Sequence, residues 1–240
     1  MSNLLFLDIE TTGLDTDICE VIEVAYQTST DVDSYNWSEL YKPNLPIPPD
    51  VSGVTNIDNS DVAEKFSFES SRQYYNLLSW SAVSIAVAHN TDFDLAVLAN
   101  YDINFEKSIC THKLAWALLP DLPNHKLGTL RAYFGIPHGN GTAHRAEYDV
   151  EILMQVFDKL VELALSKETD RDDIKPIGYM LGLSDRAKLE YLNTWHFGKY
   201  KGEKIDPDQH ETYIMWNIEK NKSLSKNFRV HLIELINYTI

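Results

Sequence analysis

The chain has 240 residues, 44% of them hydrophobic and 24% charged, which is the composition of an ordinary globular protein. Its longest apolar runs are far too short to span a bilayer, and Cys19 and Cys110 form neither a metal-type pair nor a disulfide framework, so we expect no membrane partner and a reducing, cytoplasmic location. The net charge of −15, taken alone, argues against a polyanionic partner.

The first predicted elements are two strands separated by a turn. Leu4–Ile9 is almost entirely aliphatic, so we expect a strand buried on both faces. No basic segment precedes it, which favours a core strand over a signal peptide. A turn through Thr11–Gly13 leads into a second strand at Val21–Gln27. Three prolines in Asn44–Pro49 indicate a loop or a sheet edge.

Helical patterns dominate the rest of the chain, with one further strand. The apolar run Val83–Ala88 predicts a central strand. Three glycines and a proline in Gly135–Gly141 predict a mobile loop. Beyond a charged linker, we expect a short helix, an aromatic and basic segment, and a terminal amphipathic helix. The other helices are expected at Ser70–Leu78, directly after Ala88, at Thr111–Leu118, at Leu127–Tyr133, and at Ala146–Leu165.

This order of elements predicts an α/β domain with a mixed sheet, followed by a smaller region. We place the main domain at 1–168, a linker or helical connection at 169–182, and a small C-terminal domain at 183–240. Residues 183–240 contain 9 basic and 8 acidic side chains, which leaves 12 basic and 28 acidic side chains in the preceding 182 residues. A cation site in the main domain would account for part of this acidic excess.

Two carboxylates lie at the end of the first strand. Asp8 and Glu10 are two residues apart, so their side chains share one face. Their mutual repulsion and the cost of leaving water would both be relieved by a divalent cation, and oxygen ligands suit Mg²⁺ or Mn²⁺. The alternative is a solvated strand end where the charges are harmless.

Four further residues have an ordinary structural explanation beside a functional one. Asp94 and Asp149 fall near the starts of predicted helices, where the helix dipole favours negative charge. Asn90 is a plausible cap for the first of these helices. His144 ends the glycine-rich loop, so it is either a mobile general base or an ordinary solvated histidine.

The three acidic segments together resemble the DEDDh branch of the DnaQ-like 3′→5′ exonucleases. Phe6–Leu14 reads FLDIETTGL and resembles the first motif of that family. Ala88–Asp94 reads AHNTDFD and resembles the second, and His144–Asp149 reads HRAEYD and resembles the third. The histidine five positions before the last aspartate marks the DEDDh branch. Ordered motifs at suitable distances are a specific signal.

The resemblance implies the architecture and the chemistry. It implies an RNase H-like mixed five-stranded sheet flanked by helices, with a small C-terminal α+β extension. Asp8, Glu10, Asp94 and Asp149 would hold two Mg²⁺ or Mn²⁺ ions, and His144 would take a proton from the attacking water. The substrate contacts that we predict are Thr11, Thr12 and Gly13 through their backbone N–H groups, Leu14 against the last base, and Asn90, Phe93, Lys113, Lys126 and Arg145.

Two other segments bear on the substrate. Phe197–Gly202 resembles the C-terminal segment of the bacterial exonuclease X group, within a stretch where aromatic and basic residues alternate. Those side chains would either stack on bases and meet phosphates or form a core with solvated lysines. One departure from the family lies at Thr55–Asp58, where relatives carry a histidine and this chain has none.

The predicted function is removal of nucleotides from DNA 3′ ends, single-stranded or duplex, in DNA repair or end processing. The alternatives are an RNA-trimming exonuclease on the same fold, and a non-catalytic binding module or polymerase-associated subunit. The sequence carries no signal for an oligomeric state.

Overall fold

The computed structural model describes residues 3–29, 36–138, 145–169 and 173–237. The chain forms two compact units, Met1–Asp185 and Arg186–Ile240, and each is described by itself below.

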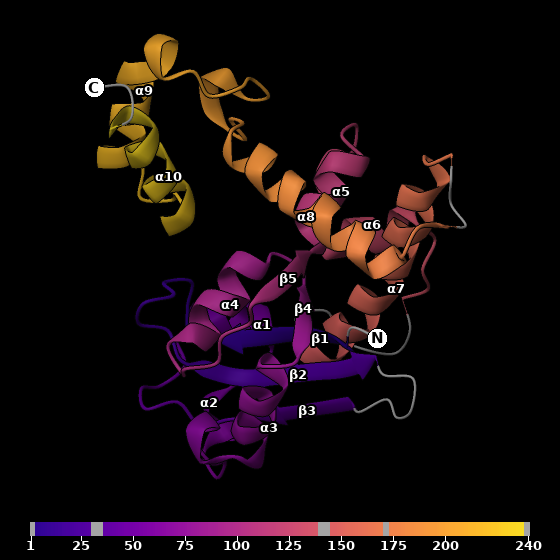
Figure 1. Cartoon of the computed structure of the whole chain (residues 1–240). Helices are drawn as coiled ribbons and strands as arrows, with labels where there is room; N and C mark the ends of the chain where they lie inside the picture. The colour runs from indigo at the N-terminus through magenta and orange to yellow at the C-terminus, as the bar shows by residue number, and fades with distance from the viewer. Residues whose placement is uncertain (1–2, 30–35, 139–144, 170–172, 238–240) are drawn as a thin grey trace. The chain divides into compact units, whose positions relative to one another are not determined.

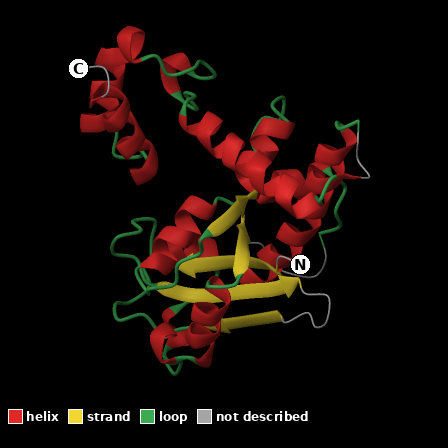
Figure 2. Ribbon diagram, viewed as in Figure 1, coloured by secondary structure: helices red, strands yellow, loops and turns green. Residues whose placement is uncertain are grey.

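The first unit is built on a five-stranded sheet in the order β3-β2-β1-β4-β5 (Figures 1 and 2). The central strand β1 pairs antiparallel with β2 and parallel with β4, so the sheet is mixed, as expected. The strands are β1 (Asn3–Thr11), β2 (Val21–Ser29), β3 (Asn36–Leu40), β4 (Ser84–Ala88) and β5 (Lys107–Cys110). The sequence patterns located β1, β2 and β4 but not the two edge strands.

Alternation along β1 sends its side chains into two different cores. Leu4 and Phe6 face a layer formed by α5 (Thr111–Leu118), α6 (Leu127–Tyr133), α7 (Ala146–Ser166) and the start of α8 (Pro176–Leu192). Leu5, Leu7 and Ile9 face the opposite layer, which contains α3 (Arg72–Ser81) and α4 (Thr91–Ala99). Helices therefore cover both faces of the sheet, and β1 is buried on both sides, as its aliphatic run predicts (Figure 2).

The long helix α7 covers the first face, and it spans the whole predicted range and one further residue, Ser166. Its apolar stripe is buried against the sheet, and the Phe157 ring meets Phe6 edge to face with centroids 5.4 Å apart. Helices α5 and α6 have the predicted bounds, and α3 begins two residues later than expected. Between β3 and α3 lie α1 (Pro49–Thr55), α2 (Asn59–Val62) and a 3-10 turn at Phe68–Ser70, none of which the sequence patterns indicated.

The second unit has a small core around Trp195. That indole is fully buried, and its Nε1 donates to His210 Nδ1 at 3.1 Å. Phe197 and Tyr200 pack on the same cluster, whereas Lys199 and Lys201 are exposed. Of the two alternatives for this segment, the structure therefore agrees with a core formed by the rings, with the lysines facing solvent. The α-helices of this unit are the end of α8, α9 (Pro207–Lys220) and α10 (Lys226–Asn237). Its described residues also hold a 3-10 turn at Gly198–Tyr200 and one isolated bridge, Thr194–Lys204.

The predicted linker at 169–182 is partly helical in the structure. The continuous helix α8 begins inside the predicted linker and runs past the division between the two units at Asp185 and Arg186.

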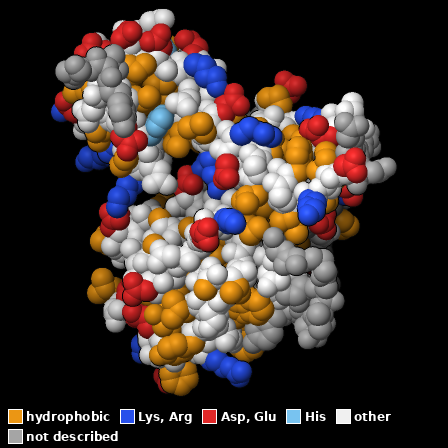
Figure 3. Space-filling view, in the orientation of Figure 1, with side chains coloured by type: hydrophobic (Ala, Val, Ile, Leu, Met, Phe, Trp, Pro, Cys, Tyr) orange, Lys and Arg blue, Asp and Glu red, His pale blue; other side chains and the backbone are white. Residues whose placement is uncertain are grey.

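Among the described helices, none is both long and apolar enough to cross a membrane. On the face seen in Figure 3, acidic and basic side chains interleave rather than forming separate fields.

The packing of α7 against the sheet predicts a large cost for truncating its buried stripe. Leu160→Ala should lower the free energy of unfolding by about 2–5 kcal/mol, because Leu160 is fully buried in this core. Leu45→Ala, at a side chain that is 71% exposed, should change it by less than about 0.5 kcal/mol. Urea unfolding of both variants checks this, and equal losses would contradict the assignment of the core.

Candidate active site

The first two acidic side chains of the site project from the carboxyl end of β1. Asp8 and Glu10 follow Leu4 and Phe6 in the alternation, so they belong to the face that α7 covers. Pairing with β4 ends at Phe6, and both carboxylates therefore lie beyond that strand. Pairing with β2 continues, with an irregularity between Glu10 and Thr11. Such bulges redirect the chain next to functional sites.

Two helices bring the other carboxylates to this strand end. Asp149 lies in the first turn of α7, and Asp94 lies in the first turn of α4, which follows β4. One carboxylate oxygen from each of Asp8, Glu10 and Asp149 lies within 4.8 Å of the other two. Asp94 is buried at 3% exposure, and its charge acts on Asp8. The structure thus brings together all four acidic residues that the sequence singled out.

Crowding and burial disfavour the charged forms of these groups. Burial, and then the charges of Asp94 and Glu10, raise the pKa of Asp8 well above its ordinary value. Burial raises the pKa of Glu10 to about 8, with Asp149 the largest charge contribution. Burial also raises the pKa of Asp94 to about 7, against hydrogen bonds from backbone N–H groups. A divalent cation would relieve this repulsion, and a donor set of carboxylate oxygens alone fits Mg²⁺ or Mn²⁺.

The third motif is described only from Arg145 onward. His144, the predicted base, lies outside the described residues, as do residues 139–141 of the predicted loop Gly135–Gly141. Arg145 is the N-cap residue of α7, and its guanidinium is paired with Glu23 of β2. Glu23 was not predicted. Its only signal in the sequence is a carboxylate inside an otherwise buried strand.

The turn after β1 is closed by its own hydrogen bonds. Thr11 Oγ1 donates to the Gly13 carbonyl at 2.6 Å, and the Thr12 N–H donates to the Glu20 carbonyl at 2.9 Å. The predicted contact between the Thr12 N–H and a nucleotide is therefore not available in this structure. Leu14 is 89% exposed, and Ile18 in the same turn is also exposed. The contact of Leu14 with a base stays a prediction.

Two of the basic residues predicted to contact substrate, Lys113 and Lys126, and the further basic residue Arg131 of α6 differ in accessibility. Lys113 is buried and forms an ion pair with Asp92. Lys126 is exposed at the N-cap of α6. Arg131 donates to the Ile136 carbonyl at 2.8 Å and so closes the end of α6. Of these three, Lys126 is the one whose side chain faces solvent, and its contact with substrate stays a prediction.

The start of α4 holds two further predicted contacts. Asn90 occupies the N-cap position in a left-handed conformation (φ 77°), but its side chain forms no capping hydrogen bond. Its backbone carbonyl accepts from the Phe93 N–H at 3.0 Å instead. Asn90 is exposed, and Phe93 is half-buried against the core. Both residues lie within four positions of Asp94 in the chain, and the side chain of each is at least partly accessible to solvent.

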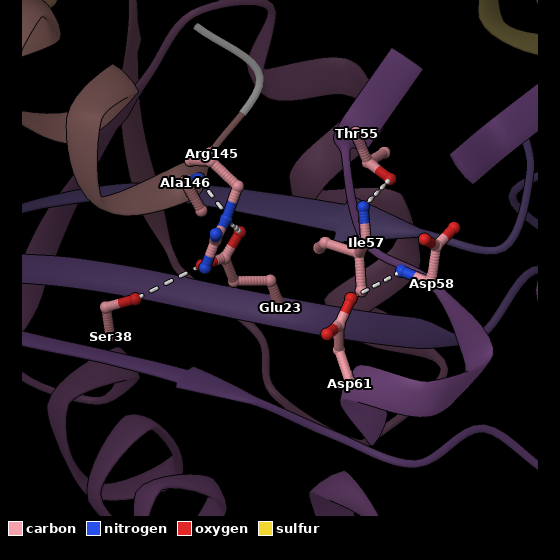
Figure 4. Close-up of polar contacts among 8 residues, drawn as sticks. All are labelled: Glu23, Ser38, Thr55, Ile57, Asp58, Asp61, Arg145 and Ala146. Atoms are coloured by element: carbon pink, nitrogen blue, oxygen red, sulfur yellow. Dashed lines mark hydrogen bonds and ion pairs between the residues drawn. The ribbon is translucent and has the colours of Figure 1, made fainter. Parts of the chain in front are cut away.

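The segment that lacks the family's histidine connects two short helices. The Thr55 hydroxyl accepts from the Ile57 N–H, and Asn56 ends α1 in a left-handed conformation. Asp58 begins α2, where its N–H donates to Asp61 at 2.7 Å (Figure 4). These polar side chains are engaged in helix ends.

Comparison with known proteins identifies relatives of this arrangement. The family model RNase_T, described as Exonuclease, matches residues 5–157. Exodeoxyribonuclease 10 of Escherichia coli (strain K12) is 27% identical over 95% of this chain and 96% of the relative. DNA polymerase III subunit epsilon of Treponema pallidum is 31% identical over 64% of this chain and 74% of the relative. A PolC-type DNA polymerase III of Caldanaerobacter subterraneus subsp. tengcongensis is 27% identical, but the chain spans only 12% of its length.

Solved structures confirm the expected RNase H-like fold. Exonuclease X in complex with 5′ overhanging duplex DNA has a TM-score of 0.57 at 25% identity, covering 75% of this chain and 99% of that chain. Exonuclease I has a TM-score of 0.60 at 20% identity, covering 80% of this chain and 46% of that chain, and this likeness concerns the fold alone.

The raised pKa values predict how stability depends on pH. Between its ordinary value of 4.5 and about 8, Glu10 holds a proton in the folded protein and releases it on unfolding. The unfolded state is therefore favoured as the pH rises, and the metal-free protein should lose stability from about pH 5 to pH 8. Thermal unfolding in EDTA measures this. Glu10→Gln should flatten the slope, and stability that rises across this window would contradict the assignment.

Proposed function

Because the chain belongs to the exonuclease family whose model matches residues 5–157, we propose that it is a metal-dependent 3′→5′ exodeoxyribonuclease that releases 5′-mononucleotides. The observation that carries the proposal is the meeting of Asp8, Glu10 and Asp149 within 4.8 Å beside the buried Asp94. A structural role alone gives no reason to gather four carboxylates from three elements, since their repulsion weakens the fold.

The acidic residues would hold the metal and leave the phosphate a cationic surface. Asp8, Glu10 and Asp149 would bind one Mg²⁺ or Mn²⁺, and Asp8 and Asp94 would bind a second. Bound ions would stabilise charge on the attacking and leaving oxygens of the phosphodiester. This arrangement also supports a polyanionic substrate for a chain of net charge −15, since the scissile phosphate would not face bare carboxylates.

The remaining residues would place the strand end and move one proton. His144 would accept a proton from the attacking water, whose oxygen bonds to phosphorus as the bond from phosphorus to the 3′ oxygen breaks. Leu14 would press its exposed side chain against the terminal base, and the Gly13 backbone would approach the last nucleotide. The products would be a 5′-mononucleotide and a strand one residue shorter.

DNA is the substrate that the relatives favour. The exodeoxyribonuclease of Escherichia coli aligns with nearly the full length of this chain, and the exonuclease X structure contains a 5′-overhanging duplex. A recessed 3′ end is the end that such a duplex offers. We therefore propose DNA 3′ ends, single-stranded or recessed in a duplex, in repair or end processing.

Substitution of the proposed ligands tests the catalytic assignment. Asp8→Asn and Asp149→Asn should each lower the rate of nucleotide release by more than about 100-fold. Changing a residue that only supports a metal ligand costs up to about 100-fold, and loss of a ligand itself should cost more. Glu151→Gln, at an exposed carboxylate two residues from Asp149 on α7, is the matched control and should keep the rate. Digestion of end-labelled oligonucleotides with Mn²⁺ measures this. Undiminished release by Asp8→Asn would remove the proposed function.

The choice of DNA is tested separately with matched substrates. We expect faster loss of single-stranded and 5′-overhanging DNA than of RNA of the same sequence, and no loss of either in EDTA. Labels at the 5′ and the 3′ end distinguish the direction of cleavage. Faster degradation of RNA would replace the substrate assignment while leaving the proposed exonuclease chemistry in place.

A further inference from the structure

One buried carboxylate beside the site has no part in the mechanism proposed above. Glu23 lies on β2 directly opposite Glu10 of β1, and it is only 1% exposed. A charge in this position is costly unless it is paired and hydrogen-bonded. The group of carboxylates close enough to share a metal ion contains Asp8, Glu10 and Asp149 but not Glu23. Its burial therefore needs another explanation.

Both oxygens of Glu23 are occupied by the residues at which α7 begins (Figure 4). The Arg145 guanidinium donates to Oε1 from its terminal nitrogen at 3.0 Å and to both oxygens from Nε at 3.2–3.3 Å. The Ala146 backbone N–H donates to Oε2 at 3.1 Å. Ser38 on β3 adds a hydroxyl donor to Oε1 at 3.3 Å. One side chain of the sheet, Glu23, is thus hydrogen-bonded to both Arg145 and Ala146 at the start of α7.

The start of α7 needs this partner because its own sequence does not supply one. Arg145 is the N-cap residue and provides no capping hydrogen bond from its side chain. The N–H of Ala146 is one of the groups that a helix start leaves without a partner inside the helix, and Ala146 is fully buried. A carboxylate near a helix start also interacts favourably with the helix dipole. Glu23, which lies on strand β2, therefore acts as a cap for the start of helix α7.

The anchored residues are connected directly to the functional ones. The Asp149 N–H donates to the Arg145 carbonyl at 3.0 Å, in the first turn of the helix. The predicted base, His144, is bonded to Arg145 in the chain. Displacement of Arg145 and Ala146 would therefore move Asp149 relative to the β1 carboxylates.

We propose that Glu23 is a positioning residue, which fixes the start of α7 so that Asp149 meets Asp8 and Glu10; this rests on the proposed function above. Arg145 has two tasks in this arrangement. It neutralises the charge of Glu23 beside Glu10. As the N-cap residue of α7, it also connects Glu23 to the start of that helix. Its side chain is 39% exposed, so part of it remains accessible from solvent while it is paired.

The test compares full-length variants by three measurements. Glu23→Ala removes every contact, and Glu23→Gln keeps one carbonyl oxygen for the Ala146 N–H but loses the charge that pairs Arg145. Glu39→Gln, at a half-buried carboxylate on β3 that accepts from the Tyr41 hydroxyl, is the matched control. For each protein we would measure amide hydrogen exchange at 146–149, Mn²⁺ affinity, and kcat and KM on end-labelled DNA.

Glu23→Ala should speed amide exchange at 146–149 and lower Mn²⁺ affinity or kcat by about 10- to 100-fold, with KM little changed. Glu23→Gln should show a smaller loss, and Glu39→Gln should match the natural chain. If Glu23→Ala does not fold, as thermal unfolding would reveal, Glu23→Gln alone decides by the same measurements. Exchange at the start of α7 that stays at the natural rate in the folded variant overturns the proposal.

A double variant tests the pairing itself. In amide exchange at 146–149 and in Mn²⁺ affinity, which do not depend on substrate contacts, Glu23→Ala combined with Arg145→Ala should lose no more than Glu23→Ala alone, because the two side chains act as one unit. Fully additive losses in these two measurements would mean that Arg145 acts independently of Glu23, and would overturn the proposed pairing. If the natural chain does not cleave DNA, the proposed function fails, while exchange and Mn²⁺ affinity still decide whether Glu23 positions α7.

Discussion

Repulsion between carboxylates that the fold forces together is the constraint on which the rest of the structure depends. Asp8, Glu10, Asp94 and Asp149 would separate if the chain were free, because each raises the cost of ionising its neighbours. Two hydrophobic cores, one on each face of the sheet, hold the supporting elements in place. Stability is thus given up at the strand end and recovered elsewhere in the domain. A cation that binds there regains part of it, which couples metal binding to folding.

The alternation of a single strand explains why the site forms where it does. Even-numbered side chains of β1 pass from Leu4 and Phe6 in the core to Asp8 and Glu10 beyond the end of β4. The helix on that face supplies Asp149, and the helix that follows β4 supplies Asp94. The strand is central and buried on both faces, so its end is rigid, and a rigid support is what a metal site requires.

Much of this was readable from the sequence, and the exceptions have physical causes. The stripe of α7 and the aliphatic runs of β1 and β4 are strong periodic signals, and the spacing of Asp8 and Glu10 directly fixes their shared face. Strand β3 is short, polar and half-exposed, so it has no such signal. Asp94 has a sufficient local explanation at a helix start, and its burial depends on the packed strand end. Glu23 contacts a residue 122 positions away, which no local pattern encodes.

The most direct measurement is anomalous diffraction from crystals soaked in Mn²⁺. We expect a peak bounded by carboxylate oxygens of Asp8, Glu10 and Asp149, and loss of that peak in Asp149→Asn crystals. Manganese bound only at other acidic side chains, with these three oxygens left apart from any ion, would contradict the claim that their repulsion exists to hold a cation.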